Sequence, residues 1–180
     1  MDNGACSYRR YLDGDETAFE QIVKDYRDPL VFFIFGIVKD YHAAEDIAID
    51  VFAYLAADRR FNFKVSLKTY LFTVGRSRAI DYIRRRKRRE ALDISVAEPY
   101  LSETTFEEDF LADLRKKELH RAIATLPERM RTAVYLVYFE DLSYKETAKI
   151  MKLSKKQVDN LLYRAKADLR SIITEKGNII

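Results

Sequence analysis

Near the C-terminal end of the chain, basic and amide side chains are spaced so that they share one face of a helix. This face consists of Lys156, Asn160, Tyr163 and Arg164, with Lys155, Asp159 and Lys166 at its margins. Asparagine and arginine can each form paired hydrogen bonds with base edges in the major groove, whereas marginal lysines suit phosphates. The pattern indicates a surface that binds double-stranded DNA.

Two helix N-termini position this face, and both are marked in the sequence. Ser143 is followed three residues later by Glu146, and Ser154 by Gln157, so each pair is a capping box. The spacing predicts a helix over 144–151, a turn over 152–154 and a second helix after it, as in a helix-turn-helix. Glycine is frequent in such a turn, so a positive φ at Lys152 would cost about 1 kcal/mol.

An apolar stripe on the opposite side of the second helix supports this interpretation. The stripe contains Val158, Leu161, Leu162, Ala165 and Leu169 at helical spacing. A solvated amphipathic helix in an ordinary bundle would carry the same stripe. Two capping boxes at this separation, together with a basic outer face, favour DNA binding over that alternative.

A run of six cations, RRRKRR at positions 84–89, also suits nucleic acid. It ends a predicted helix that Ser66 can cap and that carries Leu67, Leu71 and Val74. Neighbouring cations repel one another, so a phosphate backbone would explain them, although a solvated tail or a localisation signal has the same composition. Nearby aromatic residues could stack on unpaired bases or lie in the core: Phe61, Phe63, Tyr70, Phe72 and Tyr82.

The remainder of the first half predicts further helices. Phe19, Ile22, Val23 and Tyr26 form an apolar stripe that we expect Pro29 to interrupt, and the apolar run at 30–38 then forms a separate buried helix. A third helix has an apolar inner face and an acidic outer face. Its inner face contains Ala44, Ile47, Ala48, Val51, Phe52 and Leu55, and its outer face Glu45, Asp46 and Asp50.

A change of charge separates the two halves of the chain. Positions 90–114 carry eight acidic residues and no basic one, so we expect a linker over 90–105 between domains at 1–89 and 106–180. In the second domain, apolar residues predict a helix ended by Pro127 and another over 130–138. With five Gly and three Pro in 180 residues, the sequence predicts an all-α protein of two small helical domains.

Composition excludes several classes of protein. Because Cys6 is the one cysteine, neither an internal disulfide nor a cysteine metal cluster can form, which fits a reducing cytoplasm. We expect the N-terminal segment around Cys6 to be mobile. The longest apolar run has nine residues, fewer than the roughly 20 of a membrane helix. His42 and His120 are far apart in sequence, and the adjacent Glu45 and Asp46 diverge on a helix. We therefore expect no catalysis, metal, cofactor or membrane insertion.

The order of these elements resembles one family, the extracytoplasmic-function (ECF) sigma factors, which are promoter-specificity subunits of bacterial RNA polymerase. AAEDIAIDVF at 43–52 resembles the polymerase-binding motif of the family. SLKTYLFTVGRSRAIDYIRRRKRR at 66–89 resembles its minus-10 helix, and the segment 126–170 its minus-35 domain. Three motifs in this order are more specific than any one of them.

The resemblance implies a sigma factor that binds core RNA polymerase and promoter DNA, with the melted minus-10 strand on the first domain and the minus-35 duplex on the helix-turn-helix. It implies polymerase contacts at Glu45, Asp46, Ile47, Asp50 and Phe52. It implies minus-10 contacts at Asn62, Lys64, Lys68, Arg76, Arg78, Arg84 and Arg85, with loop 62–68 capturing a flipped base. It implies minus-35 contacts at Ser154, Lys155, Lys156, Gln157, Asp159, Asn160, Tyr163, Arg164 and Lys166.

Four positions depart from the usual pattern of the family. Tyr70 replaces a common Trp, Ser77 a common Asn and Ile49 a common Gln, and Asp159 stands where a basic residue is frequent. These departures concern the promoter sequence more than the function. The closest alternative function is a stand-alone regulator that binds duplex DNA without polymerase. We expect a monomer in the bacterial cytoplasm; many family members bind an anti-sigma factor, which no residue here identifies.

Overall fold

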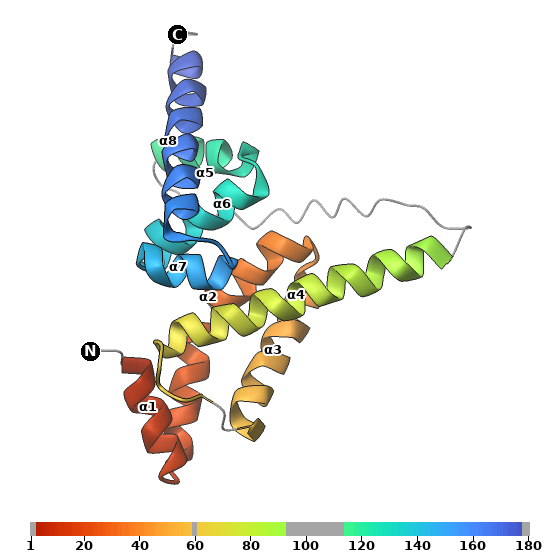
Figure 1. Ribbon diagram of the computed structural model, residues 1–180, viewed down its shortest axis with the longest axis vertical. Coiled ribbons are helices and arrows are strands. Elements are labelled where there is room, and N and C mark those ends of the chain that lie inside the picture. The colour runs from red at the N-terminus through yellow and green to blue at the C-terminus, as the bar shows by residue number, and fades with distance from the viewer. Residues whose placement is uncertain (1–2, 59–60, 93–113, 178–180) are drawn as a thin grey trace. The chain divides into compact units, whose positions relative to one another are not determined.

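The computed structural model describes residues 3–58, 61–92 and 114–177, and the chain divides into two compact units, Met1–Ser102 and Glu103–Ile180 (Figure 1). Within the described ranges the elements are helices and no strand is present, which confirms the all-α prediction. None of the described helices combines the length and apolarity needed to cross a bilayer. The predicted linker, 90–105, lies from residue 93 onward outside the described residues.

The described residues of the N-terminal unit form four helices. They are α1 (Asn3–Leu12), α2 (Glu16–Val38), α3 (Tyr41–Asp58) and α4 (Leu67–Leu92). Helix α2 packs against the other three, and α3 packs against α4. Ile22, Leu30, Ile34, Val51 and Leu71 are fully buried between these helices. The arginine-rich end of α4 projects beyond α2 and α3, so the six cations lie on a helix that is largely open to solvent (Figure 1).

Two predictions for this unit are wrong. Pro29 does not interrupt the second helix, because α2 continues through it, with buried side chains both before and after the proline. The proline removes one backbone hydrogen bond, and burial on both sides stabilises the helix despite that loss. The segment around Cys6 is not mobile but forms α1, anchored by Tyr8, whose hydroxyl donates to the carbonyl of Leu55 at 3.1 Å.

The C-terminal unit also contains the predicted helices. They are α5 (Leu114–Thr125), α6 (Glu128–Val134), a π-helical turn η1 (Tyr135–Phe139), α7 (Tyr144–Met151) and α8 (Lys155–Gly177). Helix α8 packs against α5, α6 and α7, and its C-terminal part extends beyond them (Figure 1). Leu126, Met130, Leu136, Ile150 and Leu162 form the core. The helix predicted over 130–138 is divided between α6 and the π-helical turn.

Candidate nucleic-acid interface

The turn between α7 and α8 has the predicted geometry. Ser143 N donates to Glu146 Oε2 at 3.0 Å, and Glu146 N donates to Ser143 Oγ at 3.3 Å. Ser154 N donates to Gln157 Oε1 at 2.8 Å, and Gln157 N donates to Ser154 Oγ at 3.2 Å. Lys152 adopts the left-handed conformation at φ 54° and ψ 47°. Both capping boxes are therefore confirmed, and Lys152 has the positive φ whose cost is given above.

The face predicted to contact DNA lies on the solvent side of α8. Lys156, Asn160 and Arg164 are exposed, and Tyr163 keeps 76% of its accessible surface. On the opposite side, Val158, Leu162 and Ala165 are buried, while Leu161 and Leu169 are half-buried. Because the apolar stripe packs inward, the polar face is presented outward as one surface. Lys155 and Asp159 are exposed at its margins.

A second set of side chains joins this face from α7. Ser143, Tyr144 and Lys145 at the start of α7 line an open hollow of about 870 Å³ with Lys155, Lys156 and Asp159 at the start of α8. The two helix N-termini therefore reach the same surface, where their partial positive charge favours anions. Our sequence analysis missed the three residues of α7 as candidate contacts. The first capping box could have identified them, since it marks where α7 begins.

Lys166 is held by an aromatic residue that the sequence analysis also missed. Its Nζ lies 5.4 Å from the centre of the Tyr138 ring, and a hydrogen bond with Tyr138 raises the pKa of Lys166. Tyr138 belongs to the π-helical turn and keeps 48% of its surface exposed. The Lys166 side chain is therefore restrained at the margin of the α8 face.

The residues predicted to dock on polymerase have different environments on α3. Asp46 and Asp50 are exposed, whereas Glu45 is half-buried and accepts from Arg27 Nη2 at 2.7 Å. Ile47 and Phe52 keep 7% and 6% of their surface, so they hold α3 against the unit from inside. Between the two aspartates, Ile49 is 61% exposed. Asp46, Ile49 and Asp50 thus place two carboxylates and one aliphatic side chain next to one another on the exposed face of α3.

The residues predicted to bind the minus-10 strand extend along loop 62–68 and α4. Asn62 Oδ1 accepts from the backbone of Lys64 at 3.2 Å, which shapes the loop, and both side chains are exposed. Lys68 and Arg76 are half-buried, whereas Arg85 is exposed. Arg84 pairs with Asp81 at 3.5 Å. These basic side chains therefore lie on one helix and the loop that precedes it.

The nearby aromatic residues divide between core and surface. Phe61 and Phe72 keep 3% and 0% of their surface and are core residues. Phe63, Tyr70 and Tyr82 are half-buried. The centre of the Phe63 ring lies 4.8 Å from the centre of the Phe61 ring and 4.8 Å from the guanidinium carbon of Arg9. Of the five aromatic candidates, Phe63, Tyr70 and Tyr82 therefore retain surface that a base could contact.

A groove brings the two predicted sites of the N-terminal unit together. It has a volume of about 610 Å³ and is bounded by acidic residues on and before α3 and by arginines and one aspartate on α4. The lining includes Asp40, Asp46, Asp50, Asp81, Arg78, Arg85 and Arg89. Arg78 Nη1 lies 3.3 Å from Asp50 Oδ2 across it. A predicted polymerase contact and a predicted DNA contact are therefore paired with each other.

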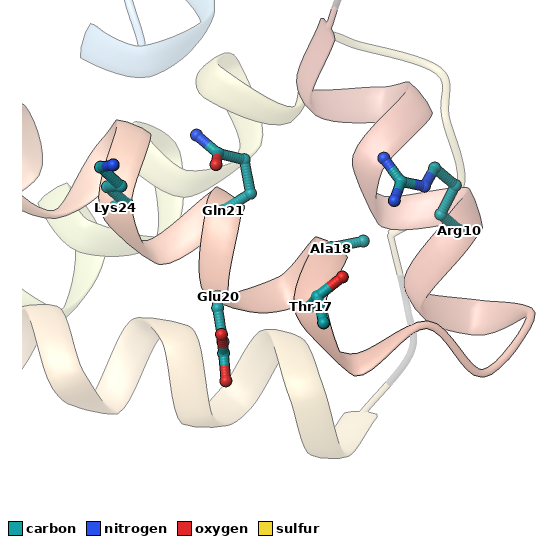
Figure 2. A pocket seen from close by; sticks show the side chains of 6 residues that line it. All are labelled: Arg10, Thr17, Ala18, Glu20, Gln21 and Lys24. Atoms are coloured by element: carbon teal, nitrogen blue, oxygen red, sulfur yellow. The ribbon is translucent and has the colours of Figure 1, made fainter.

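A smaller polar hollow of about 420 Å³ lies between α1 and the start of α2 (Figure 2). Its lining is Arg10, Thr17, Ala18, Glu20, Gln21 and Lys24. Arg10 and Thr17 both donate to the carboxylate of Asp15, which caps α2. The hydrogen bond from Thr17, followed by that from Arg10, lowers the pKa of Asp15. No predicted site residue lies in this hollow, and its bonds stabilise the α1–α2 junction.

Metal ligands are not clustered in the part of the chain that the structure describes: no three His, Cys, Asp or Glu side chains there could share an ion.

Comparison with known proteins gives matches over both units. The family model described as Sigma-70 region 2 matches residues 22–89, and that described as Sigma-70 region 4 matches residues 116–169. ECF RNA polymerase sigma factor SigM of Bacillus subtilis is 27% identical over 88% of this chain and 97% of its own. SigW of the same organism is 29% identical over 87% of this chain and 89% of its own.

Solved structures share the fold. The sigma factor RpoE from Bartonella quintana, in complex with the anti-sigma factor NepR, superposes with a TM-score of 0.65 at 20% identity, covering 87% of this chain and 96% of RpoE. CnrH, in complex with the cytosolic domain of CnrY, superposes with a TM-score of 0.63 at 20% identity, covering 97% of this chain and 99% of CnrH.

Proposed function

The chain belongs to the ECF sigma factors of bacterial RNA polymerase, and from that premise we propose how its two units divide the work of promoter-specific initiation. The N-terminal unit binds core polymerase and the melted minus-10 strand. The C-terminal unit binds the minus-35 duplex. The observation that carries the proposal is the order of an acidic α3, a basic α4 and a helix-turn-helix within the two matched regions. We retain domains at 1–89 and 106–180, with 90–105 between them.

For the minus-35 duplex, α8 inserts its outer face into the major groove. Asn160 and Arg164 bond to base edges, and Tyr163 offers an apolar ring to a thymine methyl group. Lys155, Lys156 and Lys166 bind phosphates along the margins. Asp159 accepts from a cytosine amino group, which allows an acidic residue in a surface that otherwise attracts phosphate. Ser154 and Gln157 contribute by fixing the start of the helix through their mutual bonds.

For core polymerase, the exposed Asp46 and Asp50 pair with basic side chains, and Ile49 adds an apolar contact between them. Glu45 contributes less, because Arg27 already occupies it. For the melted strand, the cations of α4 and loop 62–68 bind the phosphates, while half-buried Phe63, Tyr70 and Tyr82 offer rings to the bases.

The chain acts without catalysis of its own, as a specificity subunit in the bacterial cytoplasm where polymerase works. RpoE forms a complex with the anti-sigma factor NepR, and CnrH forms one with the cytosolic domain of CnrY. We propose that an anti-sigma factor likewise binds this chain and competes with polymerase for it. To test this, the chain is purified from the cells that naturally produce it. A co-purified protein that core polymerase displaces would support the proposal, and purification of the chain as a monomer would oppose it.

The decisive experiment mixes the purified chain with bacterial core RNA polymerase and follows comigration by size-exclusion chromatography. The wild-type chain should comigrate, and the double variant Asp46→Lys with Asp50→Lys should not. Glu20→Lys with Asp25→Lys is the matched control, since it reverses two exposed charges on α2 and should leave comigration intact. Tight binding to duplex DNA by the chain alone, without comigration, would instead identify a stand-alone regulator.

A further inference from the structure

The pair formed by Asp50 and Arg78 joins the outer face of α3 to α4. Arg78 Nη1 lies 3.3 Å from Asp50 Oδ2, and the side chains keep 35% and 66% of their surface, in that order. The Arg78 guanidinium also lies 5.3 Å from the centre of the Tyr54 ring. Arg78 is therefore held on the α3 side of the groove by a carboxylate and an aromatic ring.

This arrangement is particular to that pair. Asp46, one turn earlier on α3, and Arg85, two turns later on α4, line the same groove. Among the described residues, neither forms an ion pair within 4.0 Å. In this groove, therefore, Asp50 and Arg78 neutralise each other, whereas Asp46 and Arg85 do not take part in such a pair.

We propose that the Asp50–Arg78 pair couples polymerase docking to DNA binding. In the free protein, the ion pair with Asp50 reduces the attraction of Arg78 for phosphate. A basic side chain of polymerase that pairs with Asp50 displaces Arg78, which then binds the melted strand. This inference rests on the proposed docking role of α3 and adds to it a reason for the free chain to bind DNA weakly.

Thermodynamic linkage makes the coupling reciprocal. Removing Asp50 must strengthen binding of DNA by Arg78, and removing Arg78 must strengthen binding of polymerase by Asp50. The strength of an exposed ion pair limits the size of the effect to about 2- to 5-fold in each affinity. Polymerase and DNA both compete with the ion pair between Asp50 and Arg78. Because salt screens this exposed pair, the gain in affinity on removing one member should decrease as salt is raised.

The first arm of the test measures binding of a fluorescent single-stranded oligonucleotide by the free chain. Asp50→Asn should raise the affinity about 2- to 5-fold more than Asp46→Asn, which removes the same charge without releasing an arginine. In an Arg78→Gln background the advantage of Asp50→Asn over Asp46→Asn should vanish. Equal gains from the two aspartate variants, or a gain that persists without Arg78, would overturn the coupling.

The second arm measures binding of core polymerase without DNA. Arg78→Gln should bind about 2- to 5-fold more tightly than wild type, because Asp50 is then free, whereas Arg85→Gln should not. Circular dichroism and thermal unfolding establish that each variant is folded. Unchanged or weaker binding by folded Arg78→Gln, with normal wild-type binding, would overturn the coupling alone. Absence of wild-type binding would overturn both the coupling and the proposed docking role.

Discussion

The Lys166 ammonium lies 5.4 Å from the centre of the Tyr138 ring, so a residue of the π-helical turn restrains a cation at the margin of the DNA-binding helix. The two residues are separated by most of the helix-turn-helix. Their contact ties the position of a proposed phosphate ligand to the turn that precedes α7. Exposed contacts of this cation–π type contribute about 0.5–1 kcal/mol.

Replacing Tyr138 by Ala should therefore weaken binding of minus-35 duplex by about 2- to 5-fold, measured by fluorescence anisotropy. Tyr138→Phe should lose less, because the ring remains and the hydroxyl is removed. In a Lys166→Gln background, Tyr138→Ala should have no further effect. An equal loss with and without Lys166 would show that Tyr138 acts by another route.

Lys152 ends α7 at φ 54° and ψ 47°, in the conformation that costs a residue with a Cβ about 1 kcal/mol. Lys152→Gly should raise the free energy of unfolding by roughly 0.5–1 kcal/mol, measured by urea denaturation. The same change at Lys149, exposed within α7, should lower it by about 1 kcal/mol. If both variants shift stability in the same direction, backbone strain at Lys152 is not the cause.

Gly75 lets α4 approach α2 closely. A Cβ added at this position would lie 2.9 Å from Leu30 Cδ1 and 3.3 Å from Ile34 Cδ1, and both leucine and isoleucine are fully buried. Gly75→Ala should destabilise the N-terminal unit by about 1–2 kcal/mol, since overpacking exceeds the gain in helix propensity. Thermal unfolding measures this change.

Two variants test that explanation. Ser77→Ala, on the exposed side of α4, should be neutral or slightly stabilising. The double variant Gly75→Ala with Leu30→Val should lose less stability than the sum of the two single changes, because the smaller side chain makes room for the new methyl group. Strict additivity would argue against a collision with Leu30.

Asp15 makes the junction between α1 and α2 sensitive to acid. The hydrogen bond from Thr17, and then that from Arg10, holds the pKa of this carboxyl below its ordinary value of 3.8. A lowered pKa stabilises the fold above the unfolded pKa, and this stabilisation is lost as pH falls through the folded pKa. The melting temperature of wild type should therefore exceed that of Asp15→Asn near neutral pH, and the difference should begin to shrink near pH 3.8 and disappear once the pH is below the lower folded pKa.

Asparagine at position 15 can still cap α2, so this comparison isolates the charge. Thr17→Val removes the hydrogen bond that is the largest cause of the lowered pKa of Asp15. In this background, the difference in melting temperature between the chain with Asp15 and the chain with Asp15→Asn should therefore depend less on pH. A wild-type advantage that remained constant into strong acid would contradict the assignment.

Local chemistry made the helix-turn-helix predictable from the sequence. The bonds between Ser143 and Glu146 and between Ser154 and Gln157 join residues three positions apart, so the sequence contains both partners at the required spacing. The same holds for the polar face of α8, because helical periodicity alone places Asn160 and Arg164 on one side. Pro29 was misjudged for the complementary reason: its local effect is small beside the burial that stabilises α2 on both sides.

By itself, then, the sequence determined the helical class, the two capped helices and the faces that carry charge. Tertiary structure decided which of those charges remain available. Asp46 and Asp50 look equivalent on α3, yet only Asp50 meets Arg78, which lies 28 positions along the chain. Such a pair depends on how α3 packs against α4, and that packing is set by many buried contacts acting together rather than by any spacing in the sequence.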